Sequence, residues 1–216
     1  MTRSSQTAEA DWTARALLWL AAILAFRIAA LALNRTDLMF DEAQYWSWSR
    51  DLEFGYFSKP PLIGWLIAGV TGLCGDTEFC VRLPSPLLYA LGSIFVFLAA
   101  RRLYGARTGF WSALVFSTLP GVSFSSGIIS TDVPLLVLWA LALWAFVELL
   151  GTRQWRWAIL LGVAVGLGLN AKYAMIYFAG CAALYVWREP SARWLARDPR
   201  ALAAAAIALA FIAPNL

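Results

Sequence analysis

Long runs of apolar residues separated by short polar segments make up most of this chain. A helix of about 20 apolar residues is long enough to cross the hydrocarbon core of a bilayer. On that basis the pattern predicts spans at residues 14–33, 83–100, 110–129 and 133–150, and a further one at 201–216. We therefore expect an all-α membrane protein, built as a multi-spanning helical bundle.

Two other apolar stretches do not fit one full crossing each. The stretch 62–73 is short and contains several glycines, which favours an interfacial or re-entrant helix. The stretch 157–187 is too long for one crossing, and we expect it to divide into two shorter helices. The bundle then has six to seven spans in one domain, residues 1–216. The positions expected to divide the long stretch are Gly162, Gly166, Gly168 and the polar segment 170–172.

The composition supports this class of protein. Hydrophobic residues account for 61% of the chain and charged residues for 14%, whereas a soluble domain has about 25% charged residues. The mean hydropathy is +0.67, and the 12 tryptophans suit anchoring at two membrane interfaces. These values exclude a water-soluble domain. The net charge of +4 does not indicate a nucleic-acid partner, because the basic residues lie in short loops rather than along one face.

The N-terminal segment lacks the features of a secretory signal. Residues 1–11 are polar and mixed in charge, and the apolar run that follows is too long for the core of a signal peptide. That run also contains Arg27, so we interpret it as a retained span. The sequence leaves three roles open for Arg27: its side chain snorkels to the interface, pairs with an acid, or contacts a lipid phosphate.

Basic residues are distributed unequally between the two sides of the predicted bundle. With the N-terminus in the cytoplasm, the inner segments carry 11 arginines and the outer segments carry five basic residues. Cytoplasmic segments of membrane proteins show such an excess of Lys and Arg. The same topology places Asp41, Glu42, Lys59, Asp132 and Lys172 together on the outer side. Ionisable residues that gather beside a bilayer usually mark a site, so we expect the active face to be extracytoplasmic.

Acids and lysines at one membrane face suit acid–base chemistry on a substrate that is partly lipid. A carboxylate can take a proton from an attacking hydroxyl, and a lysine can stabilise negative charge on a departing phosphate. The two prolines that follow Lys59 would stiffen its backbone. Each residue also has a purely structural interpretation. Acids favour helix N-termini, which suits Asp41, Glu42 and Asp132, and Lys59 can snorkel.

Aromatic residues and two cysteines complete the outer segments. Tyr45, Trp46 and Trp48 are most simply an aromatic belt at the membrane interface, although their rings could also stack on a sugar or a prenyl chain. Cys74 and Cys80 lie on the outer side, where an exported disulfide is one option. We expect isolated buried thiols instead.

At these residues the chain resembles a known enzyme family. The segments DEAQYWSWS at 41–49 and GYFSKPPLIGWLI at 55–67, followed by STD at 130–132, are similar to bacterial members of glycosyltransferase family 39. That group is related to protein O-mannosyltransferases and to lipid A aminoarabinose transferases. The resemblance covers about residues 41–177. It implies a multi-spanning GT-C fold and a sugar donor carried on a polyprenyl phosphate.

The resemblance also implies roles for individual residues. Asp41 matches the acidic loop residue that the family uses in catalysis, and we expect it to act as general base on the acceptor hydroxyl or to hold it. Glu42 and Asp132, an acid of the second outer loop, would orient the acceptor or a divalent cation. We assign Lys59 and Lys172 to the donor phosphate. The side chains expected to line the substrate are Tyr45, Trp46 and Tyr56.

We therefore expect an inverting, polyprenyl-phosphate-sugar-dependent glycosyltransferase of the bacterial inner membrane, with a lipid, glycan or protein acceptor at the outer face. Because the chain contains no histidine, the His-containing metal site of some relatives cannot form within it, and a divalent cation is the one cofactor to consider. The family is normally longer, so we expect an N-terminal portion. Two alternatives stay open: a transporter or flippase of a lipid-linked sugar, which broken Gly-rich helices also fit, and an inactive fragment.

Overall fold

The structure is a computed structural model that describes residues 3–215, with the side chains of residues 9–215. Within that part of the chain the secondary structure is helical throughout. The longer helices are α1 (Arg3–Leu33), α5 (Pro84–Tyr104), α6 (Ala106–Thr118), α8 (Asp132–Thr152), α9 (Trp155–Ala171), α10 (Ile176–Arg188) and α11 (Pro199–Ile212). The shorter ones are α2 (Phe40–Trp48), α3 (Leu62–Cys74), α4 (Glu78–Arg82), α7 (Pro120–Ser125) and the 3-10 helices η1 (Tyr173–Met175), η2 (Pro190–Arg197) and η3 (Ala213–Asn215).

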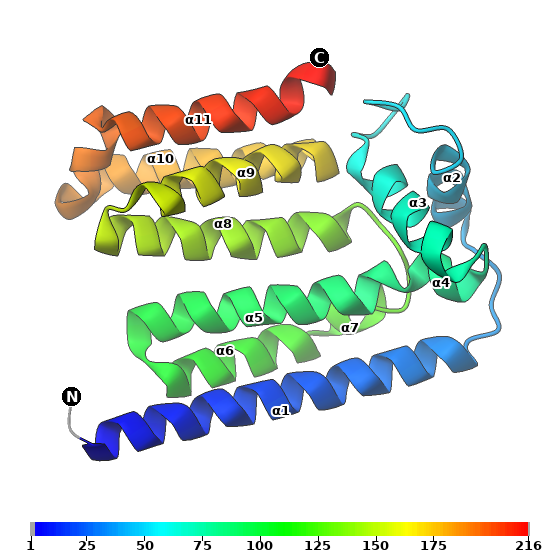
Figure 1. The fold of residues 1–216 in the computed structure, drawn as a ribbon, viewed down its shortest axis with the longest axis horizontal. Helices are drawn as coiled ribbons and strands as arrows, with labels where there is room; N and C mark the ends of the chain where they lie inside the picture. The colour runs from blue at the N-terminus through cyan, green and yellow to red at the C-terminus, as the bar shows by residue number, and fades with distance from the viewer. Residues whose placement is uncertain (1–2, 216) are drawn as a thin grey trace.

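The longer helices lie side by side as a bundle, and α2, α3 and α4 gather at one end of it (Figure 1). Among the described residues, three stretches are long and apolar enough to cross a membrane, namely Glu9–Leu33, Glu78–Tyr104 and Asp132–Thr152. This confirms the predicted all-α membrane class. The stretch 62–73 forms one short apolar helix, α3, with 13 residues, and further short apolar helices span Trp155–Ala171 and Pro199–Asn215.

Basic residues hold the opposite end of the bundle together. At the C-terminal end of α5, Arg101 pairs with Glu9 at 3.3 Å and Arg102 pairs with Glu148 of α8, also at 3.3 Å. Arg153 lies in the turn between α8 and α9 and stacks on the ring of Trp194 from η2. These contacts join α5 to α1 and α8, and the turn after α8 to η2, at the end of the bundle opposite α2, α3 and α4 (Figure 1).

The predicted span 110–129 is not one continuous helix. Helix α6 ends at Thr118, and the chain passes through an extended residue, Leu119 (φ −52°, ψ 135°), before α7 begins at Pro120. Proline disfavours a helical conformation of the residue before it and cannot donate to the helix ladder. With 13 residues, α6 is about 20 Å long at 1.5 Å per residue, which is shorter than the bilayer core of about 30 Å.

The stretch 157–187 does divide into two helices, but the glycines do not divide it. Helix α9 continues through Gly162 and Gly166, and the break comes at Lys172, where the backbone is extended (φ −161°, ψ 134°). A Cβ on Gly162 would lie 2.6 Å from the carbonyl oxygen of Ala204 in α11, and one on Gly166 would lie 2.7 Å from the Cβ of Phe211. Small residues allow two membrane helices to approach closely. The glycines thus allow α11 to pack closely against α9.

Candidate active site

The acid pair of the 41–49 motif occupies the first turn of α2. Acidic side chains are favoured there by the helix dipole, so the structural interpretation of these residues applies. Consecutive helix positions point about 100° apart, and the two acids accordingly have different surroundings. Asp41 is exposed, whereas Glu42 is only 1% exposed. One acid is therefore free to meet a substrate, and its neighbour belongs to the interior.

Both carboxylate oxygens of Glu42 are held by internal donors. Arg82 of α4 donates from Nε to Oε1 at 2.9 Å and from Nη2 to Oε2 at 2.7 Å, the two-pronged arrangement that planar guanidinium and carboxylate groups favour. The backbone N–H groups of Ile129 and Met39 each donate to one of these oxygens at 2.9 Å. Burial alone would raise the pKa of Glu42, but Arg82 and the two backbone donors together outweigh burial and lower that pKa.

Arg82 is equally well satisfied and was missed as a site residue. Its Nη1 donates to the carbonyl of Thr36 at 2.9 Å, and its Nη2 donates to the carbonyl of Asp37 at 2.8 Å. The sequence did contain a hint of its role, because Arg82 directly precedes a long apolar run. A cation in that position needs a partner. The Glu42–Arg82 pair therefore ties together α2, α4, the segment that leaves α1 and the segment that leads to α8.

Asp132 and Lys172 meet although they are 40 positions apart. Asp132 is the first residue of α8, and Lys172 lies at the break between α9 and η1. The Lys172 Nζ lies 2.6 Å from Asp132 Oδ1, and the two side chains stay 35% and 50% exposed, respectively. The predicted convergence of these two residues on one end of the bundle is thus present. Since solvent screens an exposed pair, the contact is more important for placing the lysine than for stability.

The charges of Asp41 and Asp132 both act on Tyr45. The tyrosine lies one helical turn after Asp41, and its side chain is buried. Burial raises the pKa of Tyr45, the charges of Asp41 and Asp132 raise it further, and a hydrogen bond with Thr131 lowers it. The phenol therefore stays protonated, and the charges of both acids act on it. We refer to Asp41, Tyr45, Asp132 and Lys172 as the acid–lysine cluster.

Lys59 is presented by a tight turn. Tyr56 and Lys59 exchange backbone hydrogen bonds, with N–O distances of 3.0 and 3.4 Å. The Tyr56 ring stacks on Trp48 of α2 with centroids 4.7 Å apart and planes 2° apart, and its hydroxyl donates to the Trp48 carbonyl at 2.9 Å. Tyr56 thus supports the turn from within. Among the side chains that the structure describes, Lys59 has no ion-pair partner.

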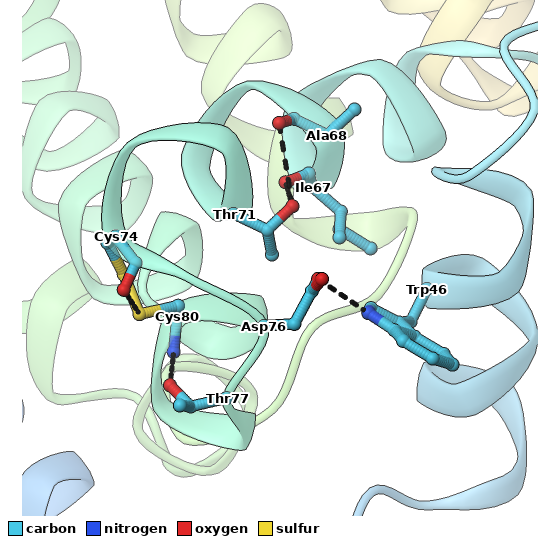
Figure 2. The surroundings of a disulfide bond; sticks show 8 residues. All are labelled: Trp46, Ile67, Ala68, Thr71, Cys74, Asp76, Thr77 and Cys80. Carbon is cyan, nitrogen blue, oxygen red and sulfur yellow. Dashed lines mark hydrogen bonds between the residues drawn. A yellow bond between two sulfur atoms is a disulfide. The ribbon is translucent and has the colours of Figure 1, made fainter.

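Trp46 is anchored to a disulfide-closed loop. Its indole N–H donates to Asp76 Oδ1 at 3.2 Å (Figure 2), and Asp76 also pairs with Arg50 at 2.7 Å. Asp76 lies between Cys74 and Cys80, which form a disulfide with 6.0 Å between their Cα atoms. The expectation of isolated thiols is therefore wrong, because the turn between α3 and α4 brings the two cysteines together. The loop holds the far end of α2 through Trp46.

A shared cation between Glu42 and Asp132 does not fit this arrangement. All the hydrogen bonds of the Glu42 carboxylate go to Arg82 and to two backbone N–H groups. In the described part of the chain, no group of three or more acidic or cysteine side chains is placed to hold a metal ion.

Comparison with known proteins gives a consistent picture. Residues 58–216 match the family model described as dolichyl-phosphate-mannose-protein mannosyltransferase. The chain is 38% identical over 192 residues to the lipid A galacturonosyltransferase RgtD of Rhizobium johnstonii, and this alignment covers 88% of the chain and 40% of that protein. It is 30% identical over 200 residues to the lipopolysaccharide core galacturonosyltransferase RgtA of the same organism, covering 92% of the chain and 40% of that protein.

A shorter alignment relates the chain to a third transferase. The undecaprenyl phosphate-alpha-4-amino-4-deoxy-L-arabinose arabinosyl transferase of Pseudomonas aeruginosa is 34% identical over 125 residues, which cover 54% of this chain and 22% of that protein. The chain thus spans about 40% of the length of the two galacturonosyltransferases. No solved structure matches it.

Proposed function

This chain belongs to the dolichyl-phosphate-mannose-protein mannosyltransferase family, and we propose that it acts as a membrane glycosyltransferase with a polyprenyl-phosphate-linked sugar as donor. The names of two relatives specify transfer to lipid A and to the lipopolysaccharide core. The name of a third specifies a sugar carried on undecaprenyl phosphate. A lipid or glycan acceptor at the end of the bundle that carries α2 fits these relatives best.

The observation that carries this proposal is the acid–lysine cluster. It combines an exposed carboxylate, Asp41, with a lysine, Lys172, that a second carboxylate holds at 2.6 Å. A transfer reaction needs both kinds of group, because a proton must leave the acceptor and negative charge must be stabilised on the leaving phosphate. Asp41 begins α2, Asp132 begins α8 and Lys172 follows α9, and these helix ends lie at the same end of the bundle (Figure 1), where we expect a lipid-linked donor to reach them.

In the proposed reaction the acceptor hydroxyl attacks the anomeric carbon of the donor from the face opposite the phosphate. The bond between the anomeric carbon and the phosphate oxygen breaks, and the polyprenyl phosphate leaves with the bonding electrons. Asp41 takes the proton of the hydroxyl. Lys172 and Lys59 offset the charge of the leaving phosphate, and Asp132 keeps Lys172 in place. Such a single displacement inverts the configuration of the sugar.

Glu42 takes a different role from the one its sequence position indicated. Its oxygens are occupied by Arg82 and two backbone donors, so we assign it to positioning rather than to the acceptor. It fixes the first turn of α2, which carries Asp41, relative to Ile129, three residues before Asp132. Tyr45 and Tyr56 belong to the same support, since one is buried beside the acids and the other braces the turn of Lys59.

Sugar transfer in liposomes tests the proposal, with the protein expressed from its full reading frame and a set of polyprenyl-phosphate sugars as donors. We expect Asp41→Asn to lower the transfer rate by roughly 10²-fold or more, the range typical of losing a general base. Asp51→Asn is the matched control, because Asp51 is also an exposed acid near α2. Wild-type transfer by Asp41→Asn would refute the role of Asp41. Donor binding by the wild type without transfer to any acceptor would favour a transporter.

A further inference from the structure

Helix α1 buries an arginine inside the apolar part of the bundle. Arg27 is only 7% exposed, and its Nη2 donates to the carbonyl oxygen of Ser117. Ser117 lies in the last turn of α6, where helix carbonyls lack an intrahelical partner. The early end of α6 at Thr118 therefore supplies one acceptor for the guanidinium.

One acceptor does not satisfy this side chain. A guanidinium has five N–H donors, and the carbonyl of Ser117 is the one protein acceptor it meets among the described residues. No carboxylate in that part of the chain lies within ion-pair distance of it. A cation in a membrane span is costly unless it is paired. In the described part of the chain, Arg27 thus has no counter-ion, and most of its N–H donors have no protein acceptor.

The guanidinium lines a cavity of about 420 Å³ between α1 and the short helix α7. The polar residues of the cavity wall are Asn34 at the end of α1 and the serines Ser123 and Ser126 of the α7 region. The rest of the wall is apolar and includes Phe26 and Ala30, which lie on α1 with Arg27 and are exposed. A basic group, two serine hydroxyls and an apolar wall together suit a molecule with an anionic head and a hydrocarbon chain.

The depth of the cavity also suits a lipid. Arg27 lies six residues before the end of α1 at Leu33, a distance of about 9 Å along the helix axis at 1.5 Å per residue. This part of α1 is at the end of the bundle that carries α2 (Figure 1). The guanidinium is therefore near the level at which lipid head groups meet the hydrocarbon core, where arginine binds phosphate with two parallel hydrogen bonds.

From these observations we propose that the cavity between α1 and α7 binds the phosphate group of a membrane lipid, with Arg27 as its counter-ion and the hydrocarbon chain lying along Phe26 and Ala30. The site is separate from the acid–lysine cluster, and the proposal does not depend on sugar transfer. The phosphate could belong to a phospholipid or to a polyprenyl phosphate, because both present the same anionic group.

Native mass spectrometry of the detergent-solubilised protein tests this site. The probes are phosphatidylglycerol, undecaprenyl phosphate, inorganic phosphate and a diacylglycerol that has the same chains without phosphate. We expect Arg27→Leu to weaken binding of the lipid phosphate roughly tenfold or more, as the loss of a charged hydrogen bond implies. Arg27→Lys should retain part of the affinity. Arg15→Leu is the control, since Arg15 lies on the same helix but is exposed.

A second variant covers the case in which Arg27→Leu does not fold. Ala30→Trp keeps the charge of Arg27 and fills the opening of the cavity, so it should weaken binding of the lipid phosphate to a similar degree. Unchanged binding in both Arg27→Leu and Ala30→Trp would overturn the site. Equal binding of diacylglycerol would exclude a role for the phosphate, and inorganic phosphate binding as tightly as the lipids would exclude a role for the chain. Whichever of the two phosphate-containing lipids binds more tightly identifies the source of the phosphate.

Discussion

Replacing Glu42 with glutamine tests how α2 is held. The substitution preserves the shape of the side chain but turns one acceptor oxygen into an N–H₂ donor. Each Glu42 oxygen now accepts two hydrogen bonds, one from Arg82 and one from a backbone N–H. Whichever oxygen is replaced, the new donor faces two other donors, and the buried guanidinium loses its counter-charge. Because the Glu42 and Arg82 side chains are each only 2% exposed, solvent cannot compensate.

Removing one partner of such a buried pair costs about 3–5 kcal/mol of folding free energy, and we expect a loss in this range for Glu42→Gln. The measurement is denaturant unfolding in detergent micelles, followed by circular dichroism. Glu53→Gln is the matched control, because Glu53 is an exposed acid of the neighbouring loop. Surface substitutions of this kind change stability by about 0.5 kcal/mol or less.

The double variant Glu42→Leu/Arg82→Met separates the cost of an unpaired charge from the value of the pair. Replacing both members of a buried ion pair by apolar residues of similar size is often neutral or stabilising. We therefore expect the double variant to be more stable than Glu42→Gln. If the free energy of unfolding of Glu42→Gln lies within about 0.5 kcal/mol of the wild-type value, the ion pair does not hold α2 in place.

Three further predictions concern stability. Because the pKa of Glu42 is lowered in the folded state, its contribution to the free energy of unfolding is complete above the ordinary glutamate pKa of about 4.3. That contribution is lost as the pH falls through the lower folded-state pKa. When the free energy of unfolding is measured against pH, the loss in acid should therefore be smaller in Glu42→Gln than in the wild type. Gly166→Ala places a methyl carbon 2.7 Å from a side chain of α11 and should lower the free energy of unfolding by about 1–3 kcal/mol. Gly180→Ala is the control and should be tolerated, because a Cβ there meets nothing within 4 Å. Thermal unfolding of both variants in micelles checks this difference. Cys74→Ala/Cys80→Ala opens a short disulfide loop and should lower the free energy of unfolding by about 2 kcal/mol, and an equal stability of the oxidised wild type and the double variant would contradict it.

Local sequence patterns predicted three long apolar helices and the meeting of charged residues from distant segments at one end of the bundle. The apolar runs of α1, α5 and α8 are long enough to be unambiguous, because length and hydropathy alone decide whether a helix can cross a bilayer. The helix order explains why Asp132 and Lys172 can meet. Asp132 begins α8 and Lys172 follows the end of α9, and both helix termini lie at the same end of the bundle. Their exact partnership could not be derived from the pattern.

The remaining features depend on tertiary contacts that a linear pattern does not contain. The glycines of α9 look like helix breakers in sequence, but Gly162 and Gly166 are needed because α11 approaches them closely. The end of α6 could have been read from Pro120, whose effect on the preceding residue is local. Arg82 could not be identified as the partner of Glu42, because the pair is formed only when α4 folds back onto α2.

The acid pair of the 41–49 motif divides two tasks between neighbouring residues. Glu42 is anchored to Arg82 and to the N–H of Ile129, so the first turn of α2 cannot rotate or move away from the start of α8 without breaking a buried ion pair. Asp41 is thereby held exposed one helical turn before the buried Tyr45, on which the charges of Asp41 and Asp132 both act. The cost of forming this arrangement is met during folding, before any substrate binds. Under the proposed function, Glu42 would therefore position the two acids without touching the substrate.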